Sequence, residues 1–291
     1  MELPLTVGID GSDNSLRALD WAADEAVRRG LPLRIVHASV WERYEGAAPS
    51  GEQAEEEAAA LRLLADAAVR ARYRAPQQRV ETDLLADEPV TALVAASREA
   101  AALVTGSSGH GSLRDLLPGS VSLAVAGRSH CPVVVVRGDE RHRGETYRRI
   151  LVGVGDGDGA VAALRFALRE AVVRGCEVRA VRAWRHAEHE PVPVMGVLDR
   201  EPGLGPEERA AAALDAALGP LGAEFPQVTV HRSTVEGPTH KVLIRLSGEA
   251  DLLVLGSPWR HLHIGLQPGR VGHSVLHHAA CPVAVVPYTH P

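Results

Sequence analysis

The sequence predicts an α/β protein made of two tandem, doubly wound domains, each with a five-stranded parallel sheet. Three observations predict this fold. The chain has 291 residues, which suits two domains of about 145 residues each. CPVVVV at 131–136 returns as CPVAVV at 281–286, and VGID at 7–10 returns as VGVG at 152–155. Within each copy, apolar runs typical of strands alternate with helical patterns, as in parallel sheets covered on both faces.

The elements of the first copy follow from local signals. Ser12 or Asp13 is placed to cap the first helix, Gly30 to end it, and Pro89 to begin the third. We expect strands at Leu5–Ile9, Leu33–Ala38, Val80–Leu85, Ala102–Thr105 and Val133–Val136, a long helix at about Glu52–Tyr73, and a short one at about Ser120–Ala126.

The second copy repeats this order, so we expect domains at 1–138 and 147–291, joined by the polar segment 137–148. Val133–Val136 and Val283–Val286 are expected to pair within the chain, giving an internal pseudo-dimer that hides two sheet edges. The sequence leaves open whether two whole chains also form a homodimer.

Composition excludes several classes of protein. The net charge is −6 and no basic stripe is present, which argues against nucleic-acid binding. No apolar run reaches the ~18 residues of a membrane helix, and the start lacks the pattern of a signal peptide. The three cysteines form no CxxC pair, which favours free thiols in a reducing compartment. We therefore expect a cytoplasmic protein.

A glycine-rich loop after the fourth strand carries the functional prediction. It contains Gly106-Ser-Ser-Gly109, then nine residues, then Gly119-Ser120 at the start of a helix. Glycines let backbone approach a phosphate closely, and the free N–H groups of a helix N-terminus favour an anion. Ser120 and Ser122 add hydroxyl donors. Ligands of such sheets bind beyond the carboxyl ends of the strands, so the loops after strands one and four form the expected site.

The spacing Gly-x2-Gly-x9-Gly-Ser, followed by a short helix and a CPV-valine strand, resembles the ATP-binding signature of universal stress proteins. The segment VGIDGSDNSLRALDWAA at 7–23 also resembles the opening of that family, and the likeness spans both halves. The resemblance implies an ATP site, with or without Mg²⁺. The positions that match are Gly8 and Asp10 on the adenine side, Ala38 at a backbone contact to adenine, and Gly106, Gly109, Gly119, Ser120 and Val121 at the phosphates.

Structural alternatives accompany these assignments. Glycines after a strand are often turn residues only, and Asp10 is equally able to cap the following helix. His110 and Arg114 lie in the same loop, either on the phosphates or in solvent. The nine-residue spacing and the following serine favour binding.

The second copy departs from the signature. Its loop has Gly256 and Gly269, but Trp259 replaces the middle glycine and Arg270 replaces the serine. Gly155 stands in place of Asp10, with Asp156 beside it. We therefore predict weak ATP binding or none in the second half.

Histidines also gather in the second copy, at His261, His263, His273, His277 and His278. His273 and His277 are spaced to share a helix face and hold a metal, but no carboxylate or cysteine accompanies them at ligand spacing. The favoured interpretation is exposed histidines, with no metal.

No P-loop, dinucleotide fingerprint or nucleophile elbow is present. We expect a nucleotide-responsive stress regulator that acts on an unknown protein partner, with slow ATP hydrolysis at most. One alternative is an ATP-independent interaction module. Another is an enzyme related to the ATP pyrophosphatases or to electron-transfer flavoproteins.

Overall fold

The computed structural model describes residues 2–40, 51–107, 119–186, 204–258 and 269–288. Its ten strands form one continuous sheet in the order β3-β2-β1-β4-β5-β10-β9-β6-β7-β8. The first half contributes β1 (Leu5–Gly8), β2 (Leu33–Ala38), β3 (Val80–Leu85), β4 (Ala102–Gly106) and β5 (Val133–Val136). The second half contributes β6 (Arg149–Gly153), β7 (Glu177–Trp184), β8 (Val230–Glu236), β9 (Leu252–Pro258) and β10 (Val283–Tyr288).

Every strand pair within a half is parallel, as the sequence predicts. The two halves meet at β5 and β10, which pair antiparallel with Ala284 opposite Val134. The expected pairing of the last strands within one chain is therefore confirmed.

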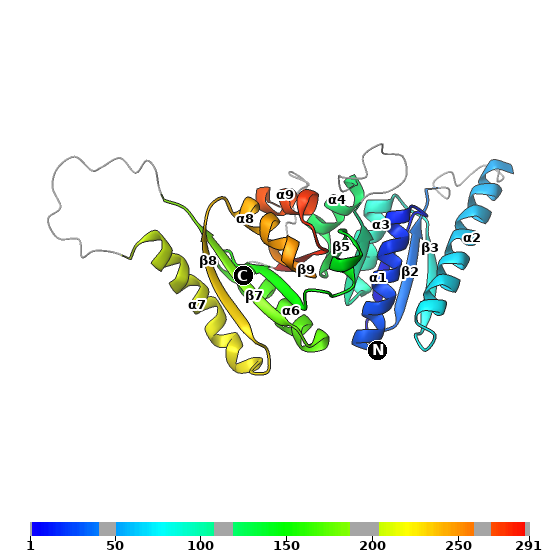
Figure 1. The fold of residues 1–291 in the computed structure, drawn as a ribbon. Helices are drawn as coiled ribbons and strands as arrows, with labels where there is room; N and C mark the ends of the chain where they lie inside the picture. The colour runs from blue at the N-terminus through cyan, green and yellow to red at the C-terminus, as the bar shows by residue number, and fades with distance from the viewer. Residues whose placement is uncertain (1, 41–50, 108–118, 187–203, 259–268, 289–291) are drawn as a thin grey trace, which may run out of the picture.

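The helices form two layers on the sheet. α1 (Asp13–Arg29), α2 (Gly51–Arg74), α6 (Asp158–Arg174) and α7 (Pro206–Glu224) pack on one hydrophobic cluster. α3 (Pro89–Ala96), α4 (Ser120–Arg128), α8 (Thr239–Leu246) and α9 (Arg270–His278) pack on the other. In Figure 1, α1 and α6 lie near the centre, and α2 and α7 lie at the outer ends.

The strands divide their side chains between these two layers. On β4, Leu103 points to one cluster and Val104 to the other, and on β5 Val133 and Val134 do the same. All four are at most 1% exposed. Strands buried on both faces need apolar residues at every position, which explains the continuous runs in the sequence.

Capping residues set the helix ends where the sequence places them. Ser12 is the N-cap of α1 and accepts a hydrogen bond from the Ser15 N–H at 3.2 Å. Gly30 ends α1 in the left-handed conformation, with φ at 65°. The joining segment 137–148 is not entirely irregular, because it contains the short helix α5 (Glu140–Arg143), capped by Asp139. An aspartate cap explains this helix, which the polar composition concealed.

The two halves also meet through a buried charge cluster between α1 and α6, made of Glu25, Arg29, Glu170 and Arg174. Arg29 contacts Glu25 at 2.7 Å and Glu170 at 2.5 Å, while Arg174 contacts Glu25 at 2.7 Å and Glu170 at 3.5 Å. Each glutamate is followed four residues later by its arginine, so the repeat places the same pair on both sides of the seam.

Candidate functional site in the first half

The first-half site lies where the strand order of the sheet reverses. β1 is flanked by β2 on one side and by β4 on the other, and Val7 lies opposite Val104. Successive crossovers run to opposite sides of β1, which leaves a crevice between the carboxyl ends of β1 and β4. Asp10 follows β1 and Gly106 ends β4, so the sheet brings these two predicted site residues to one edge.

Asp10 organises the turn that leads into α1. Its carboxylate accepts hydrogen bonds from the Ser12 N–H at 3.0 Å and from the Ser12 hydroxyl at 2.6 Å. Ser12 in turn caps α1, and Gly11 between them has φ at 81°. Asp10 remains exposed, so it supports the helix start while presenting a carboxylate to solvent at the crevice. The capping alternative and the ligand-contact alternative are therefore compatible.

The end of β2 lies beside this turn. The Nδ1 atom of His37 lies 2.8 Å from the carbonyl oxygen of Ile9, which joins the ends of β1 and β2. Ala38 is the last residue of β2 and is half-buried. Gly8 lies below, where an added Cβ would come within 2.9 Å of the Leu93 side chain. Its lack of a side chain thus makes room for α3.

Gly106 has a structural reason to be glycine. A Cβ at this position would lie 2.8 Å from the backbone carbonyl group of Asn14 and 2.9 Å from the nitrogen of Ser15. The first turn of α1 therefore rests directly on the end of β4. This close approach fixes the first turn of α1 against the end of β4.

The two ends of the glycine-rich loop are fastened together. The Gly119 N–H donates to the Ser107 carbonyl at 2.7 Å, and the Ser122 hydroxyl donates to the Gly106 carbonyl at 2.7 Å. Ser122 is buried and has committed its hydrogen to this bond, so it holds α4 against β4. Gly109, His110 and the rest of 108–118 lie outside the described residues.

α4 begins at Ser120 with Gly119 as its N-cap. Glycine has no side chain to satisfy the N–H groups of the first helical turn, and in the part of the chain that the structure describes no side chain caps them. Ser120 is exposed, and Val121 packs partly on the core below it. This helix start combines backbone N–H donors, a positive dipole end and a hydroxyl, which is the chemistry that binds an anion.

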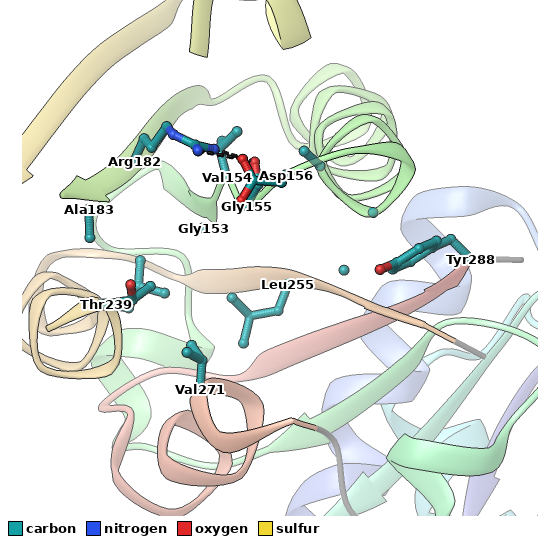
Figure 2. A pocket seen from close by; sticks show the side chains of 14 residues that line it. Gly153, Val154, Gly155, Asp156, Arg182, Ala183, Thr239, Leu255, Val271 and Tyr288 are labelled. Atoms are coloured by element: carbon teal, nitrogen blue, oxygen red, sulfur yellow. Dashed lines mark hydrogen bonds and ion pairs between the residues drawn. The ribbon is translucent and has the colours of Figure 1, made fainter. Parts of the chain in front are cut away.

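The corresponding crevice of the second half has a volume of about 320 Å³. Figure 2 shows Arg182 and Asp156 on one side and Tyr288 on the other. The Arg182 guanidinium donates to the Gly155 carbonyl and pairs with the Asp156 carboxylate. The acid of this half is thus already neutralised by a cation from β7.

Two further features change the second crevice. An added Cβ on Gly159 would lie 2.4 Å from the Tyr288 ring, so this aromatic side chain covers the first turn of α6. Arg270 begins α9, whereas Ser120 begins α4. Trp259 lies outside the described residues.

Arg182 and Tyr288 line the crevice without being part of the sequence signature. Arg182 stands 145 residues after His37, so aligning the ends of the second strands would have found it. No sequence pattern indicates that Tyr288 lies there, because its position depends on how far β10 extends along the chain.

Comparison with known proteins gives the family. The model of the universal stress protein family matches residues 3–137 and again residues 146–287. The chain belongs to the universal stress protein family. It is 32% identical over 292 residues to a universal stress protein of Mycobacterium tuberculosis, covering 97% of this chain and 96% of that protein. A second from the same organism is 33% identical over 266 residues, covering 91% and 92% of the two chains.

The fold of the family is found along the whole chain. The crystal structure of a universal stress protein from Archaeoglobus fulgidus superimposes with a TM-score of 0.74, at 20% identity, over 99% of both chains. The chain is thus a tandem of two universal stress protein domains. In the part of the chain that the structure describes, no helix has the length and apolarity to cross a membrane.

Proposed function

We propose that the first domain binds an adenine nucleotide, ATP with or without Mg²⁺, and that this binding regulates a protein partner. One observation carries the proposal. The uncapped start of α4 faces the point where the strand order reverses, and the Ser107–Gly119 bond fixes that start beside Gly106. Backbone donors at this position suit a triphosphate in a chain whose only lysine, Lys241, is in the other half.

The adenine side of this proposed site is formed by Asp10, Gly8 and the end of β2 at Ala38. Asp10 is exposed at the crevice, and its position is set by two hydrogen bonds from Ser12. These assignments rest on the match between this sequence and the ATP-binding signature of the family. The loop residues Gly109 and His110 belong to the same proposal.

The second domain is proposed to bind ATP weakly or not at all. Its acid, Asp156, is paired with Arg182, and Tyr288 covers the first turn of α6. An incoming nucleotide would have to break a charged pair and displace an aromatic ring. Trp259 and Arg270 further remove the small residues of the signature.

Regulation is favoured over metabolism because the pairing of the Ser12 hydroxyl with the Asp10 carboxylate at the first crevice serves to cap α1. ATP would change the surface around 107–118 that a partner reads, with slow hydrolysis at most. The free cysteines support a cytoplasmic location. An interaction module that does not use ATP is the competing function.

Matched variants in the two halves test the proposal. Asp10→Asn keeps an oxygen acceptor for Ser12 but removes the charge, and Asp156→Asn is the equivalent change in the second half. Calorimetric titration of ATP should show about tenfold weaker binding for Asp10→Asn, because a hydrogen bond to a charged group contributes about 1.5–3 kcal/mol. Asp156→Asn should bind ATP like the unmodified protein. Equal affinity in all three proteins would contradict the assignment of Asp10, and the absence of ATP binding in all three would favour the ATP-independent module.

A further inference from the structure

The histidine pair His273 and His277 lies on one face of α9, away from both crevices. The Nε2 atoms of the two rings are 3.2 Å apart, and the ring centroids are 4.3 Å apart. Both side chains are half-buried, so each retains access to solvent. The two histidines, four residues apart in the sequence, therefore bring two imidazole nitrogens close together.

Two imidazole nitrogens that face each other at this distance need either a hydrogen atom or a cation between them. Either one nitrogen carries a hydrogen and donates it to the other, or both direct lone pairs at a shared cation. The Nδ1 atom of His277 has no hydrogen-bond partner among the described residues. A metal ion bound at Nε2 would place the ring hydrogen on Nδ1, and no hydrogen bond from Nδ1 to the described residues opposes that tautomer.

The distance between the two nitrogens fits a metal chelate. Bonds of about 2.0–2.1 Å from zinc to histidine nitrogen, with the nitrogens 3.2 Å apart, give an N–Zn–N angle of about 100–106°. This is close to the tetrahedral angle that zinc prefers. The two rings therefore need little movement to share one ion.

The last turn of α9 is held in place from the other half of the chain. Arg137, just after β5, donates from its guanidinium to the carbonyl oxygens of Leu276 and His277, the latter at 2.9 Å. This anchors the turn that carries His277 relative to the turn that carries His273. A chelate gains affinity when its ligands are positioned before the ion arrives.

We propose that His273 and His277 form a binding site for a divalent transition-metal ion of the zinc class. Imidazole nitrogens suit zinc, nickel and copper, whereas magnesium and calcium prefer oxygen ligands. In the described part of the chain, no three histidine, cysteine, aspartate or glutamate side chains cluster as metal ligands. The pair therefore supplies two ligands, and water or an external group completes the coordination.

Titration of the full chain with Zn²⁺ alone, followed by calorimetry, tests this site. We expect Zn²⁺ to bind, and His273→Ala or His277→Ala to weaken that binding about tenfold or more, since each removes one of two ligands. His278→Ala is the matched control, because this exposed histidine is on the same helix at the wrong spacing, and it should leave the affinity unchanged.

Circular dichroism and the melting temperature without metal show whether each variant is folded. A second measurement uses the melting temperature with Zn²⁺, which should rise in the unmodified protein and in His278→Ala but not in the other two variants. The proposal is overturned if Zn²⁺ does not bind, or if the affinity survives unchanged in His273→Ala or His277→Ala.

Discussion

At the scale of single residues, the glycines of the signature serve packing as well as any ligand. Gly106 lies where the backbone of α1 meets the end of β4, and Gly256 occupies the same place against Gly159 in the second half. Both halves keep this glycine, although only the first retains the complete signature. The first glycine of the signature is thus a poor discriminator of ligand binding, because the fold itself requires it.

We predict that Gly106→Ala destabilises the protein. The added Cβ would lie 2.8 Å from the Asn14 backbone, and backbone cannot rotate away as a flexible side chain can. Overpacking of this kind typically costs about 1–3 kcal/mol in the free energy of unfolding. Urea denaturation measures the loss.

Gly222→Ala is the control for this experiment. Gly222 lies within α7, and an added Cβ there meets nothing within 4 Å. This variant should be neutral or more stable by up to about 1 kcal/mol, because alanine favours helix over glycine. Equal stability of Gly106→Ala and the unmodified protein would refute the packing role of Gly106.

At the scale of elements, the contact between α1 and α6 is dominated by the buried charge cluster. The repeat also places aromatic rings beside it, since Arg174 lies over Trp21 at 5.5 Å and Arg29 over Phe166 at 5.7 Å. Glu25 and Glu170 are 0% and 3% exposed, so their charges depend on the two arginines. Buried ion pairs of this kind add little net stability, because the loss of hydration of the charges offsets their attraction.

The charge cluster shifts the pKa values of its two glutamates in opposite directions. Burial and the nearby Glu25 carboxylate raise the pKa of Glu170 to about 7. Burial alone would also raise the pKa of Glu25, but Arg174 and Arg29 outweigh it and lower that pKa to about 2. One carboxyl group of the cluster therefore retains a proton at a pH where an ordinary glutamate has lost it.

The contribution of Glu170 to the free energy of unfolding should accordingly fall as the pH rises from about 5 to 7.5. In this pH range the folded protein keeps a proton on Glu170, whereas the unfolded chain has released it. Glu170 therefore begins to oppose folding above the ordinary pKa of glutamate. Its full unfavourable contribution is reached above the raised pKa of the folded state. Glu25 is ionised in both states over this range and acts only at lower pH. The expected change is on the order of 1–3 kcal/mol.

Chemical denaturation at several pH values compares Glu170→Gln with the unmodified protein. The glutamine variant should lose most of the slope between pH 5 and 7.5, because its side chain does not titrate. Glu224→Gln, which removes an exposed partner of Arg165, should retain the slope. An unchanged slope in Glu170→Gln would show that another group is responsible.

The sequence and the structure agree most closely on these elements. Continuous apolar runs such as Val133–Val136 identify strands because both faces of the sheet are covered. Ser12 and Gly30 mark the ends of α1 because each satisfies a specific backbone requirement. The sequence pattern does not predict that Glu25 and Arg29 are buried, since glutamate followed by arginine four residues later is typical of an exposed helix face. Their partners in the second half, Arg174 and Glu170, lie 149 and 141 residues further along the chain.

At the scale of the whole molecule, the duplication has produced one sheet whose two halves place different residues after the first and second strands. The antiparallel pairing of β5 with β10 and the charge cluster between α1 and α6 join the halves on the sheet and on one of its faces. The sequence could predict which strand edges meet, because CPVVVV and CPVAVV recur at the ends of the two copies. It could not predict that Tyr288 would reach Gly159, since this depends on the continuation of β10 beyond Val286.

The most direct test of the account is the number of nucleotides that one chain carries. Protein purified without added nucleotide is denatured, and the released material is identified and quantified by chromatography and mass spectrometry. We predict close to one ATP per chain, and none from Gly109→Trp, which copies the second half into the first. Two nucleotides per chain would contradict the predicted loss of the second site. No nucleotide, together with no binding when ATP is titrated, would contradict the central claim that the first domain is an ATP site.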